Sequence, residues 1–153
     1  MSSIKVQLPG QQEKPPTLLL AIDPGKDTGW CTFENGKIKD FGICRGLNEL
    51  IHYMESLTKI DQIVMEEFRL FKHLALQQSG SRMEVTQAEG VVKAWALRHK
   101  VPLALQPAQD PLKMGPMWSG VVMPRNHRNS HSISALYHGV YWLVKNNMWE
   151  WEI

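Results

Sequence analysis

Two short apolar runs, each ending in an acidic residue, constrain the fold of this chain more than any other feature. Residues 17–23 read Thr-Leu-Leu-Leu-Ala-Ile-Asp and are followed by Pro24-Gly25, and residues 61–66 read Asp-Gln-Ile-Val-Met-Glu. Apolar runs of this length, bounded by turn signals, predict buried strands of a sheet. Each strand would end in a carboxylate, Asp23 in the first run and Glu66 in the second.

A hairpin is predicted directly after the first strand. Asn35-Gly36 separates residues 29–34 from residues 37–44, and this dipeptide is a strong signal for a two-residue turn. Such a turn pairs residue 34 with 37 and therefore Cys31 with residue 40. Cys31 and Cys44 are then out of register, and we expect both to be reduced core residues rather than a disulfide.

Helical periodicity follows in three segments. Apolar positions recur at helical spacing over residues 47–57 and 130–147, and residues 81–100 predict a long helix in which Ser81 is the N-cap and Glu84 completes a capping box. Residues 101–106 predict a fifth strand. Residues 107–129 contain four prolines and two glycines and predict a long loop. The order βββαβαβα predicts an α/β fold: a mixed five-stranded sheet, antiparallel in strands 1–3 and parallel in strands 4 and 5, with helices on both faces.

Length and composition indicate one domain. The chain has 153 residues, of which 43% are hydrophobic, enough for a single core without disulfides. We expect residues 1–16 to be a flexible tail and residues 17–153 to be the domain. The longest apolar run, residues 18–22, is far below the roughly 20 residues of a membrane-spanning helix. We expect no membrane segment and no secretory signal, and therefore an intracellular, cytoplasmic protein.

The formal net charge of +2 conceals an uneven distribution. Residues 1–68 hold 7 basic and 10 acidic groups, whereas residues 69–128 hold 9 basic and 3 acidic groups, a net charge of +6. A basic middle segment suits a phosphate backbone. Chance clustering on an ordinary solvated surface is the alternative.

The two strand-end acids indicate metal chemistry. Ends of neighbouring strands project side chains into one cleft, so Asp23 and Glu66 could meet there. Two carboxylates that close repel each other unless a cation neutralises them, and Mg²⁺ or Mn²⁺ prefers such oxygen ligands. A two-metal site of this kind hydrolyses phosphodiesters. The residues alone leave an alternative open, in which Asp23 caps a turn and Glu66 or Glu67 is a solvated charge.

Three segments carry a resemblance to a known family. Residues 20–30, Leu-Ala-Ile-Asp-Pro-Gly-Lys-Asp-Thr-Gly-Trp, are similar to the opening motif of RuvC-type Holliday junction resolvases of the RNase H-like superfamily. Residues 63–71, Ile-Val-Met-Glu-Glu-Phe-Arg-Leu-Phe, resemble the family's fourth strand, and residues 131–138 fall where its last helix carries a His-x-x-Asp pattern. The resemblance spans residues 17 to about 145 and looks closest to short phage-encoded members, which would act in the host cytoplasm.

The resemblance implies a metal-dependent nuclease for DNA recombination and repair. Its catalytic and metal-binding residues would be Asp23, Glu66 rather than Glu67, and His131, with Mg²⁺ or Mn²⁺ as cofactor. The substrate would be branched DNA. The family dimerises through the helix after the fourth strand, which implies a homodimer through residues 81–99.

This sequence departs from the family at one position. Ser134 stands where the family has a metal-binding Asp, and a neutral hydroxyl is a poor substitute. His131 lies one helical turn earlier on the same face and can still supply a nitrogen ligand. His127, His138 and Asp110 are further candidates for the missing ligand.

Candidate DNA contacts lie mainly in the basic middle segment. Residues 68–73 mix aromatic and cationic side chains as junction binders do, and the family places a base-contacting aromatic residue in this region. Phe71 is assigned that role, although Phe68 or Phe71 could equally belong to the core. The candidate phosphate contacts are Lys72, Arg82, Lys113, Arg125 and Arg128.

Two other classes of function compete with the nuclease. A junction-binding protein could keep the fold and lose most of its catalysis together with the third acid, as Ser134 suggests. A nucleotide-binding protein of the actin and sugar-kinase type would also place Asp23-x-Gly25 before a hairpin, but it needs two related domains, and 153 residues are too few.

Overall fold

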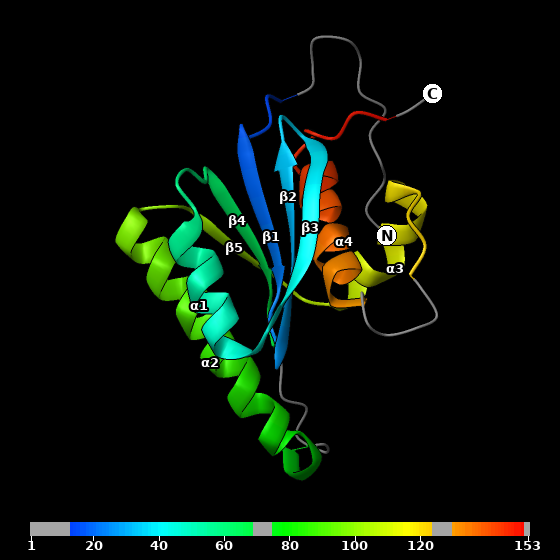
Figure 1. The fold of residues 1–153 in the computed structure, drawn as a ribbon. Coiled ribbons are helices and arrows are strands. Elements are labelled where there is room, and N and C mark those ends of the chain that lie inside the picture. The colour runs from blue at the N-terminus through cyan, green and yellow to red at the C-terminus, as the bar shows by residue number, and fades with distance from the viewer. Residues whose placement is uncertain (1–12, 69–74, 124–129, 152–153) are drawn as a thin grey trace.

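A single five-stranded sheet forms the centre of the molecule in the computed structural model, which describes residues 13–68, 75–123 and 130–151 (Figure 1). The strand order is β3-β2-β1-β4-β5. The first three strands are antiparallel, and β4 and β5 run parallel to β1. The strands are β1 (Leu18–Asp23), β2 (Asp27–Glu34), β3 (Lys37–Arg45), β4 (Gln62–Glu66) and β5 (Leu103–Gln106).

Helices cover both faces of this sheet. One face packs against α1 and α2, and the other packs against α4, with α3 beyond it (Figure 1). The predicted mixed sheet with helices on both faces is confirmed. The helices are α1 (Gly46–Ser56), α2 (Ala75–His99), α3 (Gln109–Ser119) and α4 (Ser130–Lys145).

Alternation along the central strands decides which face each side chain joins. Leu19 and Ala21 of β1 pack on the α4 side, whereas Leu20 and Ile22 pack on the side of α1 and α2. These four side chains are at most 1% exposed, so each face gains the burial of whole apolar side chains, about 1.5–3 kcal/mol for a leucine or isoleucine. Because the alternation has a period of two, Asp23 follows Ala21 onto the α4 side.

The hairpin of β2 and β3 forms at the predicted turn, but its register differs from the prediction. Asn35 and Gly36 both have positive φ, as the turn requires, and Glu34 pairs with Lys37. A bulge between Thr32 and Phe33 then shifts the pairing, so that Cys31 lies opposite Phe41 instead of residue 40.

The two cysteines are free and buried, as predicted. Cys31 belongs to the cluster on the α4 side, and Cys44 belongs to the cluster on the opposite face. The sheet therefore separates the two thiols.

The predicted loop over residues 107–129 is wrong in its first half, where α3 forms in spite of two prolines. Pro111 is the third residue of the helix, where a backbone N–H has no intrahelical partner in any case. Tertiary packing offsets the donor that Pro116 removes, because Trp118 is buried and stacks on Tyr141 of α4. Tyr137 of α4 also donates a hydrogen bond to a carbonyl just beyond α3.

Helix α2 begins earlier than predicted. It starts at Ala75, so Ser81 lies inside the helix and cannot be its N-cap. Residues 75–81 contain no proline, and nothing in them prevents the helix from extending toward its N-terminus. In the segments that the structure describes, neither α2 nor any other helix has the length and apolar character needed to cross a membrane.

The N-terminus of α4 rests directly on β2 at Gly29. A Cβ atom at this position would lie 2.0 Å from the backbone carbon and oxygen of His131, a distance that only a displaced helix could accommodate. Gly29 is also the partner of Asp23 in the register of β1 and β2. The absent side chain at Gly29 therefore allows His131 to approach the end of β1.

We expect Gly29→Ala to lower the free energy of unfolding by about 1–3 kcal/mol, because the added methyl group overpacks the contact between β2 and α4. Gly90→Ala is the matched control. Gly90 is exposed in α2 with open space around its Cβ position, so alanine there should stabilise the protein by about 0.5–1 kcal/mol. Urea denaturation measures both changes, and an unchanged midpoint for Gly29→Ala would contradict the close packing.

Candidate active site

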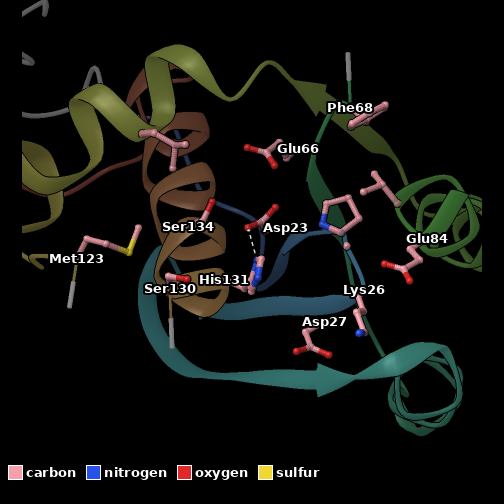
Figure 2. A pocket seen from close by; sticks show the side chains of 14 residues that line it. Asp23, Lys26, Asp27, Glu66, Phe68, Glu84, Met123, Ser130, His131 and Ser134 are labelled. Carbon is pink, nitrogen blue, oxygen red and sulfur yellow. Dashed lines mark hydrogen bonds and ion pairs between the residues drawn. The ribbon is translucent and has the colours of Figure 1, made fainter. Parts of the chain in front are cut away.

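Asp23 and Glu66 end adjacent parallel strands. Ile22 of β1 pairs with Met65 of β4, so the next residues along both strands, Asp23 and Glu66, are neighbours. Val64 packs on the α4 side of the sheet, and Glu66 follows it onto that side by the same alternation that directs Asp23. Both carboxyl groups therefore face α4, as Figure 2 shows.

Helix α4 supplies the opposite wall of the site. His131, Ser134 and His138 are spaced three and four residues apart and share the face that is turned toward the strand ends. Asp23, Glu66, His131 and Ser134 line one cleft of about 570 Å³ (Figure 2). The three residues predicted to be catalytic thus lie together, although they come from three separate elements.

Each carboxyl group is paired with one histidine. His131 Nδ1 lies 3.2 Å from Asp23 Oδ2 at the cleft, and His138 Nε2 lies 3.2 Å from Glu66 Oε1 beneath it. The two histidines differ in their surroundings, because the side chain of His131 is 44% exposed and that of His138 is completely buried. Each pair occupies one oxygen of its carboxyl group.

The two carboxyl groups have opposite pKa shifts. Burial and, to a smaller extent, a hydrogen bond with Glu66 raise the pKa of Asp23 to about 7, against the lowering effect of His131. Burial also acts to raise the pKa of Glu66, but hydrogen bonds with His138 and with Asp23 outweigh it and hold that pKa below its ordinary value. Near neutral pH Glu66 is therefore the more readily ionised of the two carboxyl groups.

The Asp23 carboxyl group also shifts the pKa of His131. Its hydrogen bond to Asp23 raises the pKa of the imidazole above its ordinary value, against burial, which lowers it. Asp27, which also lines the cleft, contributes a smaller upward shift. The acidic side chains around the cleft thus stabilise a positive charge there.

Gln106 and His138 belong to a network that the sequence analysis did not assign to the site. Gln106 ends β5 and pairs with Glu66 at the end of β4. Its Nε2 lies 3.1 Å from His138 Nδ1 and 3.0 Å from the His138 carbonyl oxygen. A signal was present in the sequence, because residues 101–106 form the fifth predicted strand, which also ends in a polar residue, Gln106.

Ser134 presents a buried hydroxyl group to the cleft. The residue is 5% exposed, and its Oγ has no hydrogen-bond partner among the described residues. Buried hydroxyl groups nearly always have a partner, so this oxygen indicates a ligand or a water in the cleft. The position at which the family would carry an acid therefore does point into the site.

Several other predicted candidates do not line the cleft. Asp110 stands beside Tyr141, where it adds to the effect of burial in raising the pKa of that phenol, and it does not line the cleft. Glu67 also lies outside the cleft, and its N–H donates to the Gln106 carbonyl. Lys113 is exposed on α3 and does not line the cleft either, although its neighbour Leu112 does.

Of the remaining predicted contacts, Phe68 alone has a side chain that the structure describes. Phe68 is described and lines the cleft, with its N–H bonded to Glu89. Two acids that were not predicted, Asp27 and Glu84, line it too. Outside the described residues are Phe71, Lys72, Arg125, His127 and Arg128, and of Arg82 only the backbone is described.

The donor set fits a hard divalent cation. Within residues 13–68, 83–123 and 130–151, no three His, Cys, Asp or Glu side chains are already arranged around a metal position. The cleft nevertheless offers two neighbouring carboxyl groups and a hydroxyl oxygen that has no partner among the described residues. Mg²⁺ and Mn²⁺ take oxygen ligands of this kind, and such a cation competes with a proton for them.

The sheet order and the two helical layers define an α/β fold of the RNase H-like class. No protein-family model matches the chain, and no curated protein matches its sequence. The structure is similar to that of Thermus thermophilus RuvC in complex with a Holliday junction substrate, with a TM-score of 0.60 and 17% identity over 85% of this chain and 97% of that chain. A second T. thermophilus RuvC structure gives a TM-score of 0.57 and 18% identity, over 84% and 97%. The chain has the fold of RuvC.

We expect the affinity for Mn²⁺ to depend on pH as the pKa of Asp23 dictates. Below about pH 7 protons on Asp23 and His131 compete with the cation, so affinity should fall by about tenfold or more for each pH unit below 7. Above pH 7 the affinity should change much less with pH. Calorimetry in two buffers should detect release of at least one proton per Mn²⁺ near pH 6 and less near pH 8. Glu67→Gln should behave like the wild type. An affinity for Mn²⁺ that does not change between pH 6 and pH 8 would contradict the raised pKa of Asp23.

Proposed function

We propose that this chain is a metal-dependent endonuclease that cleaves branched DNA such as Holliday junctions. The observation that carries the proposal is the pair Asp23 and Glu66, which lie at adjacent strand ends and line one cleft beneath α4. Support for the substrate class comes from the similarity of fold to a RuvC whose structure contains a Holliday junction substrate.

Asp23, Glu66 and His131 would hold Mg²⁺ or Mn²⁺. When bound, the ions activate a water molecule for attack on the phosphodiester and stabilise the leaving oxygen. The protein supplies two carboxyl groups in neighbouring positions, one of them already ionised. His131 can exchange its bond with Asp23 for a bond to the cation, because its side chain is only half-buried.

The DNA would be held by the basic middle segment. Residues 69–128 carry a net charge of +6, whereas the cleft is lined by several acids, so a phosphate backbone would be attracted around the site and the scissile phosphate would meet the cations. Phe68 at the cleft is a candidate to contact a base. The other proposed contacts are Phe71, Lys72, Arg82, Lys113, Arg125 and Arg128.

A homodimer through α2 would match the symmetry of a four-way junction. Part of the apolar surface of this helix is used within the domain, since Ala88, Val92 and Trp95 are buried. Met83 and Leu97 remain 66% and 83% exposed and could contact a second copy. We propose a dimer interface over residues 81–99 on this basis.

Ser134 supports a second candidate function, a protein that binds junctions but cuts them slowly. The missing carboxylate removes one negative charge beside the proposed cations, and the hydroxyl in its place has no partner among the described residues. Such a protein would have the same fold and the same DNA-binding surface and would differ from the nuclease only in its rate of cleavage.

We expect Asp23→Asn and Glu66→Gln to abolish cleavage of a labelled four-way junction in Mg²⁺ or Mn²⁺ while binding survives, because each change removes a metal ligand and little volume. Glu67→Gln is the matched control, since Glu67 is the neighbouring acid and does not line the cleft. Its rate should stay close to that of the wild type. Near wild-type cleavage by either of the first two variants would exclude this site. A wild type that binds the junction without cutting it would favour the second function.

We expect Ser134→Asp to tighten Mg²⁺ binding and to raise the cleavage rate, most strongly at low metal concentration, because the carboxylate would enter the cleft beside Asp23 and Glu66. Titration of Mg²⁺ in the cleavage assay measures the effect. If the wild type is already fully active and the variant is no better, another group supplies the ligand. A variant that binds metal and stays inert would indicate a cleft adapted to binding alone.

A further inference from the structure

Glu66 is the end of a chain of hydrogen bonds that crosses three elements of the fold. Gln106 at the end of β5 contacts His138 of α4, and His138 contacts Glu66 at the end of β4. Gln106 is 8% exposed and His138 is 0% exposed. Polar side chains this deeply buried must satisfy one another, and here the last acceptor is a carboxyl group of the cleft.

The direction of each hydrogen bond follows from one contact. Gln106 Nε2 lies 3.0 Å from the backbone carbonyl oxygen of His138, which can only accept, so this end of the amide must be the NH₂ group. The same NH₂ group lies 3.1 Å from His138 Nδ1, which must then accept. In the neutral imidazole the proton is left on Nε2, which donates to Glu66 Oε1 at 3.2 Å.

The alternative tautomer is disfavoured by the same contacts. A proton on Nδ1 would face the NH₂ group of Gln106. If the Gln106 amide were turned over to accept that proton, its oxygen would take the place of Nε2. Two oxygens that only accept hydrogen bonds, that of the amide and the His138 carbonyl oxygen, would then lie about 3.0 Å apart. Gln106 can therefore donate both of its hydrogen bonds only when His138 carries its proton on Nε2.

We propose that Gln106 and His138 are positioning residues for Glu66. Gln106 fixes the Nε2–H tautomer of His138, and His138 holds Oε1 of Glu66, so that the carboxylate keeps one orientation in which its second oxygen is left for a divalent cation. The inference rests on the proposed function, in which Glu66 is a metal ligand.

The chemistry of this pair suits a site for cations. A lysine or arginine could also hold the carboxylate, but it would place a fixed positive charge beside the metal and reduce its binding. A neutral imidazole donates a hydrogen bond without that charge. Partners of this kind, behind the ligands themselves, commonly orient metal-binding side chains and affect metal affinity by about 10–100-fold.

The tautomer can be tested directly on the metal-free protein. Long-range ¹H–¹⁵N correlation spectra distinguish a protonated Nε2 from a protonated Nδ1. We expect the wild type to show His138 with its proton on Nε2 alone. Gln106→Met, which keeps the length of the side chain and removes both donors, should give a mixture of the two forms. A wild-type spectrum with the proton on Nδ1 would overturn the proposal without bearing on the nuclease.

A matched pair of variants tests the effect on the cation. A glutamine at position 138 can still donate toward Glu66 from the place of Nε2, whereas a methionine of similar size cannot. We expect His138→Met to weaken Mn²⁺ binding by about 10–100-fold and His138→Gln to stay within about threefold of the wild type. Urea denaturation of both variants separates this effect from loss of folding.

The outcomes distinguish the positioning role from the function on which it rests. If both variants weaken Mn²⁺ binding equally, or neither does, His138 is only a packing residue and the proposal fails while the metal site stands. If the wild type itself binds no Mn²⁺, the proposed nuclease fails, and the role for Gln106 and His138 fails with it. The difference between His138→Gln and His138→Met is therefore the result that the proposal requires.

Discussion

The burial of two carboxyl groups at adjacent strand ends is the constraint on which the rest of the site depends. Strand pairing places Asp23 beside Glu66, and the alternation of side chains turns both toward α4. Two ionised carboxylates cannot be buried this close without a compensating charge. The fold compensates with two histidines from one helix and with a raised pKa at Asp23. The same carboxyl groups are suited to exchange a proton for a cation.

The packing of α4 brings those histidines to the strand ends. Most of the helix is buried between the sheet and α3, and its sheet-facing residues are apolar except near the cleft. At Gly29 the backbone of the helix contacts the backbone of β2, which leaves no room for a side chain. The apolar core and this backbone contact therefore determine how far His131 stands from Asp23.

The sequence predicted the parts of the fold that depend on local patterns. The apolar runs that end at Asp23 and Glu66, the turn at Asn35-Gly36 and the helical periodicity after Ser130 each appear as predicted. Tertiary contacts decided the parts that were missed. Helix α3 forms because Trp118 is buried against α4, although its prolines locally favour a loop.

Within the site, the sequence indicated residue types at strand ends but not how they are connected. Asp23, Glu66 and His131 line one cleft, as their positions suggested. Asp110 lies elsewhere, because α3 carries it to Tyr141. The link from Gln106 to His138 could not be predicted, since it depends on the distance between the end of β5 and the third turn of α4. That distance is set by the whole sheet.

Burial and the two histidines together explain why the pKa of Asp23 is raised whereas that of Glu66 is lowered. The side chain of Asp23 is the more deeply buried of the two, and burial raises its pKa more than the half-exposed His131 lowers it. His138 is completely buried, and Gln106 commits it to donate to Glu66, so ionisation of Glu66 is compensated by a fixed donor. One ligand of the proposed metal site is therefore readily charged before a cation binds, and a bound cation would favour ionisation of the other.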